Sequence, residues 1–273
     1  MKIDRVLLVS SNNKTYYDFW NPLSKVYKEK FNIQPTLIWV GTEQEKIDCN
    51  ISNEYGDVII AEPNRNYHIP SQCAWALFWA TQFFKDEVCF ICGIDEVPLS
   101  GMFLKDIVNE YTEEDYVMLI ADAYLPDHWT VDASSSPSGQ HVSLGRNFVK
   151  IYNFEENFAE EIEKVFTSGA HEAYLRRNPN GYWPVIIEHP YWGIDECYYS
   201  QVLRKYNGEV KIQSLSHFGL MRERRIDCMR DIEVPYDVQK LKEGWYSQAH
   251  LCRPFVRHQN YILTLFENIP VIE

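Results

Sequence analysis

The segment "CFICGIDEVPLS", residues 89–100, joins an apolar run to two adjacent carboxylates and then to a proline. Its first four residues are apolar without alternation and are bounded by Gly93, a pattern typical of a strand buried on both faces of a sheet. Asp95 and Glu96 follow where that strand leaves the core. Because a buried carboxylate without a partner is costly, we expect an arginine, a helix N-terminus or a metal ion beside it.

Strand and helix patterns alternate on both sides of this segment. Strands are expected at 5–10, 35–40, 57–62, 89–92 and 115–122, and helices at 16–31, 71–84 and about 102–109. This alternation predicts an α/β fold with a mostly parallel sheet, whose ligands lie at the carboxyl ends of the strands. Asp95 and the turn "SSNN" at 10–13 both occupy such ends.

The pattern changes after Asp122. Residues 123–145 are rich in Ser and Gly and have no periodicity, so we expect a long loop that is functional or disordered. Helices are then expected at 155–176, 192–208 and 253–269, with a strand at 209–215. We expect one domain over 1–273 with two halves, 1–122 and 123–273.

Composition excludes some classes of function. A net charge of −13 and a pI of about 5.1 argue against general nucleic-acid binding, which needs a basic surface. A small polyanion is still compatible with these values, because one local cation or helix N-terminus is enough to bind it. The familiar G-x-G-x-x-G and P-loop signatures are missing, which disfavours a dehydrogenase or a P-loop NTPase.

Location is inferred from the apolar runs and the cysteines. No run approaches the roughly 20 apolar residues of a membrane span, and the start of the chain does not resemble a signal peptide. With 7 scattered cysteines we therefore expect a cytoplasmic protein with reduced thiols. Cys89 and Cys92 stand three apart on a strand, so their side chains point to opposite faces and cannot share a metal.

"GIDEVPLS" (93–100) resembles the strand-end segment of GT-A glycosyltransferases, often written S-D-I-D-x-x-P-L. The resemblance implies that Asp95 and Glu96 hold Mn²⁺ or Mg²⁺ against the diphosphate of a nucleotide-sugar donor. Gly93 stands where the family has its first Asp, and a glycine offers only its backbone carbonyl to a metal. Either a distant ligand completes the site or metal dependence is weak. The alternative is a turn with two solvated acids.

"WGIDECYYSQVL" (192–203) resembles the acidic helix start that follows the donor site in this family. In inverting members a carboxylate there is the general base, a role the resemblance gives to Asp195, with Glu196 as second candidate. The first turn of a helix favours an ionised carboxylate, and Gly193 lets a substrate approach closely. The alternative is that both acids only cap a helix.

Other segments extend the resemblance. "AHLCRPF" (249–255) resembles a C-terminal family segment in which a His completes the metal shell and a cation contacts the donor phosphates, which implies His250 and Arg253. His217 in "SHFG" is a competing metal ligand. The expected nucleotide contacts are Ser10, Ser11, Asn12 and Gln72, although a plain turn for the first three and a backbone partner for Gln72 are equally open. The expected acceptor residues, in the long loop, are Tyr124, His128 and Trp129.

The resemblance implies a GT-A-like, Rossmann-type, mostly parallel sheet flanked by helices. Residues 1–122 would bind the nucleotide-sugar and 123–273 the acceptor. The implied reaction moves a sugar from a nucleotide-diphosphate donor, with UDP-sugar favoured, to a hydroxyl of a glycan, with inversion and Asp195 as base. Similar compact enzymes of bacteria and large algal viruses, which glycosylate their own capsids, suggest a xylosyl- or rhamnosyltransferase. Alternatives are a retaining transferase, a degenerate nucleotide- or sugar-binding protein, and a metal-dependent hydrolase that uses Asp95, Glu96 and Asp195.

Overall fold

The computed structural model describes residues 1–101, 104, 108–119, 140–170, 172, 194–214, 224–228 and 231–272. Four of the expected site residues lie outside these ranges: Tyr124, His128, Trp129 and His217. Most of the expected helix at 102–109 and the expected loop up to residue 139 lie outside them as well.

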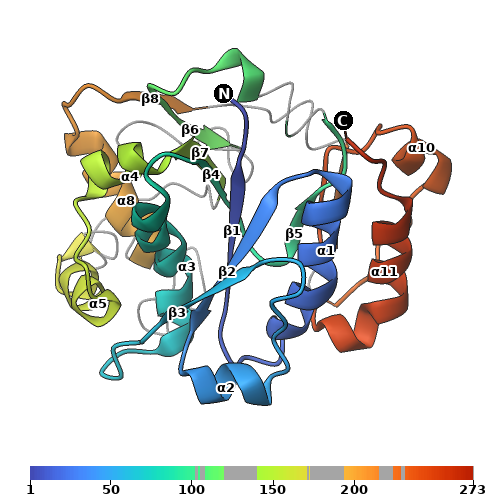
Figure 1. Ribbon diagram of the computed structural model, residues 1–273, viewed down its shortest axis with the longest axis horizontal. Coiled ribbons are helices and arrows are strands. Elements are labelled where there is room, and N and C mark those ends of the chain that lie inside the picture. Colours follow the sequence, from blue (N-terminus) through green and yellow to red (C-terminus); the bar gives the residue numbers. More distant parts are fainter. Residues whose placement is uncertain are drawn as a thin grey trace.

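A seven-stranded sheet forms the centre of the molecule (Figure 1). Its order is β3 (Asp57–Ala61), β2 (Gln34–Val40), β1 (Arg5–Ser10), β4 (Val88–Ile91), β7 (Gln140–Leu144), β6 (Asp115–Leu119) and β8 (Lys211–Ser214). β7 is antiparallel to both of its neighbours, and the other adjacent pairs are parallel. The predicted α/β fold with a mostly parallel sheet is confirmed.

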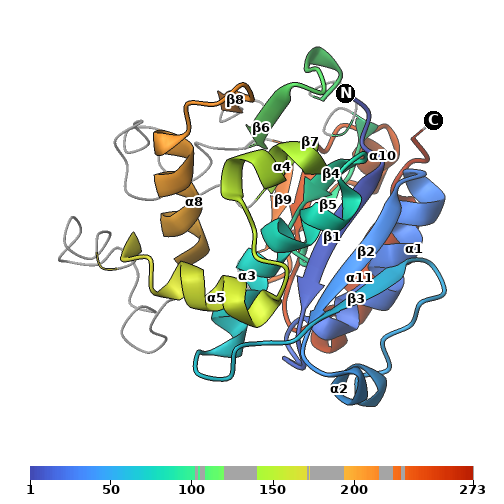
Figure 2. The same ribbon diagram turned by 60° about the vertical axis from the view of Figure 1, so that its left-hand side comes forward.

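Helices cover both faces of this sheet, as Figure 2 shows. One face carries α1 (Trp20–Lys30) and α11 (Gln259–Asn268); the other carries α3 (Ile69–Ala80), α4 (Gly145–Tyr152), α5 (Phe158–Phe166) and α8 (Ile194–Lys205). Alternate residues of β1 supply both cores: Val6 and Leu8 pack on the α1 side, and Leu7 and Val9 on the α3 side. Cys89 and Cys92 likewise join opposite cores, as expected, and all seven cysteines are free.

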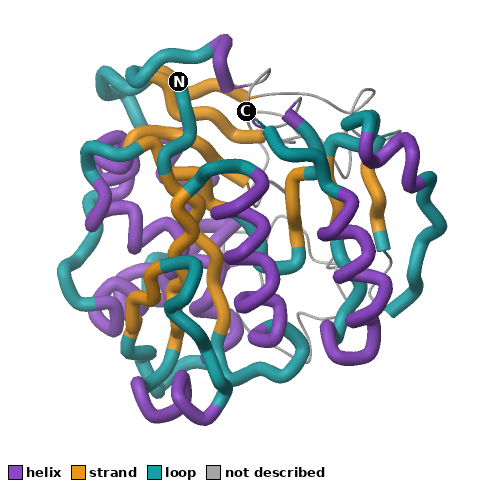
Figure 3. Tube along the Cα trace, turned by 45° about the vertical axis from the view of Figure 1, so that its right-hand side comes forward, coloured by secondary structure: helices purple, strands orange, loops and turns teal. Residues whose placement is uncertain are grey.

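A second, three-stranded sheet packs on the α1 side (Figure 3). It consists of β5 (Glu96–Pro98), β10 (Gln248–His250) and β9 (Arg225–Asp227), with β10 antiparallel to β5 and parallel to β9. Val97, Ala249 and Ile226 anchor it in the same core as α1 and α11. The segment after β4 and the C-terminal segment are therefore hydrogen-bonded neighbours.

The remaining elements are short. They are α2 (Glu43–Asp48), α10 (Val238–Lys242), and the 3-10 turns η1 (Tyr17–Phe19), η2 (Thr81–Phe84), η4 (Val108–Glu110) and η5 (Phe255–His258). Among the described helices, none has the length and apolar character needed to cross a membrane.

Two sequence expectations differ from the structure. The expected loop was wrong at its end, because Gln140–Leu144 is the strand β7 in the middle of the sheet. Its polar residues hide the strand pattern and are buried with partners: Ser143 Oγ donates to the Asp115 carbonyl at 2.7 Å, and His141 Nδ1 lies 2.9 Å from Tyr116 Oη. The helix expected at 155–176 is shorter, because Asn157 caps α5 at its start and α5 ends at Phe166.

Candidate functional site

The site lies at the point in the sheet where the order in which strands are added reverses. From β1 the chain builds outward through β2 and β3, and then returns to place β4 on the other side of β1. The carboxyl ends of β1 and β4 thus form a topological switch point, the usual position of the ligand site in an open α/β sheet. Ser10 ends β1, and Asp95 and Glu96 follow β4 directly.

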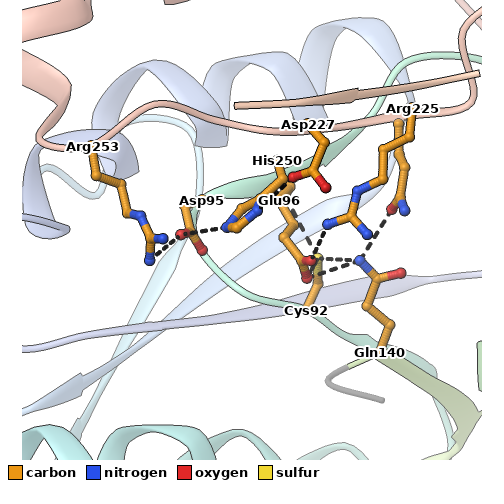
Figure 4. Close-up of polar contacts among 9 residues, drawn as sticks. Cys92, Asp95, Glu96, Gln140, Arg225, Asp227, His250 and Arg253 are labelled. Atoms are coloured by element: carbon orange, nitrogen blue, oxygen red, sulfur yellow. Dashed lines mark hydrogen bonds and ion pairs between the residues drawn. The ribbon is translucent and has the colours of Figure 1, made fainter. Parts of the chain in front are cut away.

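Asp95 is the central residue of a chain of ion pairs at this switch point. Its side chain is buried, and its Oδ2 lies 3.0 Å from Nη1 of Arg253 and 3.2 Å from Nε2 of His250. The other ring nitrogen of His250, Nδ1, lies 3.0 Å from Oδ1 of Asp227. Figure 4 shows the resulting sequence of charges, Asp227–His250–Asp95–Arg253. The parallel register of β9 and β10 places His250 opposite Asp227.

These contacts determine the charge states of Asp95, His250 and Asp227. Burial alone would raise the pKa of Asp95, but the hydrogen bond from His250 and the positive charges of His250 and Arg253 lower it. Burial opposes the charged form of His250, yet hydrogen bonds to Asp227 and Asp95 raise its pKa to about 10. The hydrogen bond from His250 also lowers the pKa of Asp227. At neutral pH the imidazolium therefore sits between two carboxylates.

Arg253 is held by the loop that follows β1 as well. Its Nη1 donates to Tyr16 Oη at 2.7 Å, and its guanidinium carbon lies 5.5 Å from the centre of the Tyr16 ring. Arg253 thus connects the loop after β1, through Tyr16, with the segment after β4, through Asp95.

Glu96 belongs to a separate polar cluster. Its Oε1 lies 3.2 Å from Nη2 of Arg225, and its Oε2 accepts a hydrogen bond from Nε2 of Gln140 at 2.9 Å. Gln140 Nε2 also donates to Oε1 of Gln248 at 3.2 Å. This cluster, to the right of Asp95 in Figure 4, joins β7 of the large sheet to the small sheet.

The expected metal site requires Asp95, Glu96 and His250 to share one ion. Instead the two carboxylates pair with different cations, and both nitrogens of His250 face carboxylate oxygens. Within the described ranges, no group of three or more His, Cys, Asp or Glu side chains is arranged to hold a metal ion. A Cβ at Gly93 would lie 3.1 Å from Asp95 Oδ1 and 3.4 Å from Glu96 Oε2. The residues as arranged do not fit Mn²⁺ or Mg²⁺.

Asp195 and Glu196 lie in the first turn of α8. Because α8 leads into β8, which runs parallel to β6, its N-terminus lies at the carboxyl edge of the sheet, the edge that carries Asp95. Burial raises the pKa of both carboxyls, and the charge of Asp195 raises that of Glu196 further. No ion pair between described residues joins these two acids to the Asp95 chain.

The expected nucleotide contacts have local partners. Ser10 and Ser11 are buried, with Ser10 Oγ donating to the Ser11 carbonyl at 3.2 Å, and the exposed Asn12 donates to Glu45 Oε1 at 3.3 Å. Gln72 is fully buried, accepts from the Asn64 N–H at 3.0 Å and donates to the carbonyls of Asn64 and Tyr67. Of the two alternatives for Gln72, the backbone partner is the one present.

Sequence reasoning missed Asp227, Arg225, Gln140 and Tyr16. Asp227 and Arg225 lie on β9, a strand of three residues that is too short to show a periodic pattern. Tyr16 was assigned to a helix, and Gln140 to the long loop. The alternation of charged and apolar residues in "RIDC" (225–228) was the one signal that pointed to a strand here.

No family model matches the chain, and no curated protein matches it. Among solved structures it is similar to the glycosyltransferase GlyE of Streptococcus pneumoniae TIGR4 (TM-score 0.41, 9% identity, 82% of this chain, 48% of that one). It is also similar to the bifunctional glycosyltransferase WbbM (TM-score 0.39, 10% identity, 98% of this chain, 50% of that one). A third is the Mycobacterium tuberculosis glucosyl-3-phosphoglycerate synthase, crystallised with Mn²⁺, UDP and glucosyl-3-phosphoglycerate (TM-score 0.32, 11% identity, 100% of this chain, 81% of that one).

The chain spans about half the length of GlyE and of WbbM. Structures of other enzyme classes match with similar scores. Likeness at this level assigns no activity to this chain.

Proposed function

We propose that this protein is a glycosyltransferase that moves a sugar from a nucleotide-diphosphate donor, a UDP-sugar, to a hydroxyl of a glycan acceptor. The observation that carries the proposal is the position of Arg253, between Tyr16 and Asp95, at the switch point of the sheet. A switch point is where an open α/β sheet usually binds a nucleotide, and an arginine there can neutralise a leaving diphosphate.

The donor side of the site would use residues around β1 and Arg253. The backbone of Ser10 and Ser11 at the end of β1, with Asn12 exposed beside them, would contact the nucleotide. Arg253 would bind the phosphates. Gln72 takes no part in this proposal, because its amide is already hydrogen-bonded to the backbone of Asn64 and Tyr67.

Asp195 is the proposed general base. Burial raises its pKa toward the range in which a carboxylate accepts a proton from a hydroxyl, and it lies at the carboxyl edge of the sheet. Base catalysis by Asp195 implies inversion at the anomeric carbon, with Glu196 as the alternative base. NMR analysis of the product anomer separates this from a retaining transferase.

The acceptor site and the transferred sugar rest on the family resemblance alone. Tyr124, His128 and Trp129 stay predictions for the acceptor, which residues 123–273 would bind, and xylose stays the predicted sugar. The role of Mn²⁺ or Mg²⁺ as cofactor is also only a prediction, which the ion pairs of Asp95 and His250 disfavour.

A panel of UDP-, GDP- and dTDP-sugars, tested by thermal shift with Mn²⁺ and with EDTA, is the first experiment. A ligand at a hundredfold excess over its Kd adds about 2.7 kcal/mol to the stability of the native state. The donor that binds is then incubated with glycan acceptors, and the sugar product is analysed. Failure of all three nucleotide classes to bind would refute the proposal.

A second candidate is a nucleotide-sugar-binding protein without turnover. Gly93, in place of the first acid of the family motif, favours it. Binding without transfer or hydrolysis over long incubation would select this candidate. Cleavage of phosphate esters without any sugar transfer would select a hydrolase.

A further inference from the structure

Arg253 has hydrogen-bonding capacity that the described residues leave unused. The described residues that bind its guanidinium, Asp95 and Tyr16, both meet it at Nη1. Within the described part of the chain, Nε and Nη2 have no hydrogen-bond partner, and the side chain is 19% exposed. These two nitrogens form the edge that binds two oxygens of a phosphate in parallel.

His250 determines how much of the charge of Arg253 is available to a ligand. Without a second cation, the Asp95 carboxylate would neutralise Arg253 by itself, and the pair would have no net positive charge to attract a diphosphate. Nε2 of His250 lies 3.2 Å from Asp95 Oδ2, and Nδ1 lies 3.0 Å from Asp227 Oδ1. An ionised carboxylate only accepts hydrogen bonds, so each ring nitrogen can bond to its neighbour here only by donating. An imidazole that donates from both nitrogens is the protonated, cationic form. The negative charge of Asp95 is thus shared between two cations.

A divalent cation at Asp95 would have to break these contacts. The metal would need the Asp95 oxygen that His250 and Arg253 now share, and a lone pair of a His250 nitrogen that carries a proton. Glu96 would have to leave Arg225, whose side chain is 9% exposed. The cations already present supply the positive charge that such a metal would bring.

We propose that the donor diphosphate binds to Nε and Nη2 of Arg253 without a divalent cation, and that His250 is a positioning residue that takes the place of the metal by neutralising Asp95. This inference rests on the proposed function, since it names how the same site binds its donor. Asp227 contacts Nδ1 of His250, orients its ring, and belongs to the same chain of ion pairs.

The test measures the Kd of UDP, GDP and dTDP by calorimetry on the full chain, once in EDTA and once in Mn²⁺. We expect one nucleotide to bind equally well in both. Arg253→Ala should weaken it about tenfold to a hundredfold, as expected for lost charge-assisted hydrogen bonds, and Arg253→Lys less. Arg257→Ala is the matched control, because Arg257 is an exposed arginine of the same segment that pairs with Asp231 at 3.4 Å.

His250→Gln tests the positioning role, because glutamine can still donate to Asp95 but carries no charge. UDP binding should weaken in His250→Gln, and the same change should have a smaller effect when Asp95→Asn has already removed the negative charge. His258→Gln is the control: His258 is a histidine of the same segment, paired with Glu233 at 2.9 Å. If His250→Gln weakens UDP binding equally in the wild type and in Asp95→Asn, and all the variants are folded, the positioning role of His250 is overturned.

The remaining outcomes separate the two proposals. Nucleotide binding that needs Mn²⁺ and disappears in Asp95→Ala would overturn the metal-free site and leave the glycosyltransferase proposal standing. Absence of binding by all three nucleotides, in EDTA and in Mn²⁺, would overturn both.

Discussion

Nε2 of His250 lies 3.2 Å from Oδ2 of Asp95, although 155 residues separate the two in the chain. This contact and the Asp95–Arg253 pair fasten the C-terminal segment to the end of β4. The candidate site therefore assembles only when the large sheet, the small sheet and the C-terminal segment have all folded.

Asp95→Ala should destabilise the fold measurably. The change leaves His250 and Arg253 partly buried without their shared carboxylate, and hydrogen bonds to charged groups contribute about 1.5–3 kcal/mol each. We expect the free energy of unfolding, measured in urea, to fall by about 2–3 kcal/mol. Asp231→Ala, which removes an exposed partner of Arg257, should change it by less than about 1 kcal/mol. Equal effects of the two changes would argue against the Asp95 cluster as a stabilising element.

The His250 contacts predict a loss of stability at alkaline pH. The pKa of His250 is raised from 6.5 to about 10, so the folded state holds a proton that the unfolded state releases. The stabilisation is complete below pH 6.5 and disappears as the pH rises through about 10. Between these limits the free energy of unfolding should fall by up to about 1.4 kcal/mol per pH unit. Urea unfolding at several pH values should show that the wild type and His250→Gln differ less in free energy of unfolding as the pH rises. A difference that stays constant with pH would contradict the raised pKa of His250.

Asp195→Asn should reduce catalysis but not donor binding. General-base catalysis typically contributes about 10²–10⁴-fold, so kcat should fall on that scale while the donor Kd stays near normal. Because burial raises the Asp195 pKa, the wild-type rate should decline on acidification at a pH above the ordinary carboxyl range. Glu196→Gln is the adjacent control and should lose less activity. If Asp195→Asn unfolds at a lower temperature but transfers sugar normally per folded molecule, Asp195 is a helix cap.

Gly93→Asp should make the protein responsive to Mn²⁺. A Cβ there lies 3.1 Å from Asp95 Oδ1 and 3.4 Å from Glu96 Oε2, so an added carboxylate would face two others. Two like charges about 4 Å apart repel each other by about 1 kcal/mol in water and by about 4 kcal/mol near a protein surface. We expect a lower Tm than in the nearly isosteric Gly93→Asn, and recovery in Mn²⁺ for the Asp variant alone. Equal Tm values for both variants would show that the cost is steric.

Several elements could be predicted because their signals are local. β1, β2, β3, β4 and β6 correspond to apolar runs, and Asp95 and Asp195 each stand two residues after a glycine, in segments that resemble known motifs. β7 was missed because the partners of Ser143 and His141, which make its burial possible, come from β6. β9 was missed because a strand of three residues is too short to show an alternation of apolar and polar residues.

The residue pattern predicts the mostly parallel α/β sheet and the position of Asp95 at the carboxyl end of a strand, whereas His250 and Arg253 were inferred from the family resemblance. The partners of all three residues follow from the pairing of distant strands. Asp95, expected as a metal ligand, pairs with Arg253 and His250, and Asp227 and Tyr16 belong to the same group of contacts. The physical reason is that hydrophobic periodicity is a property of neighbouring residues, whereas the partner of a buried charge depends on which distant strands pair, and in which register.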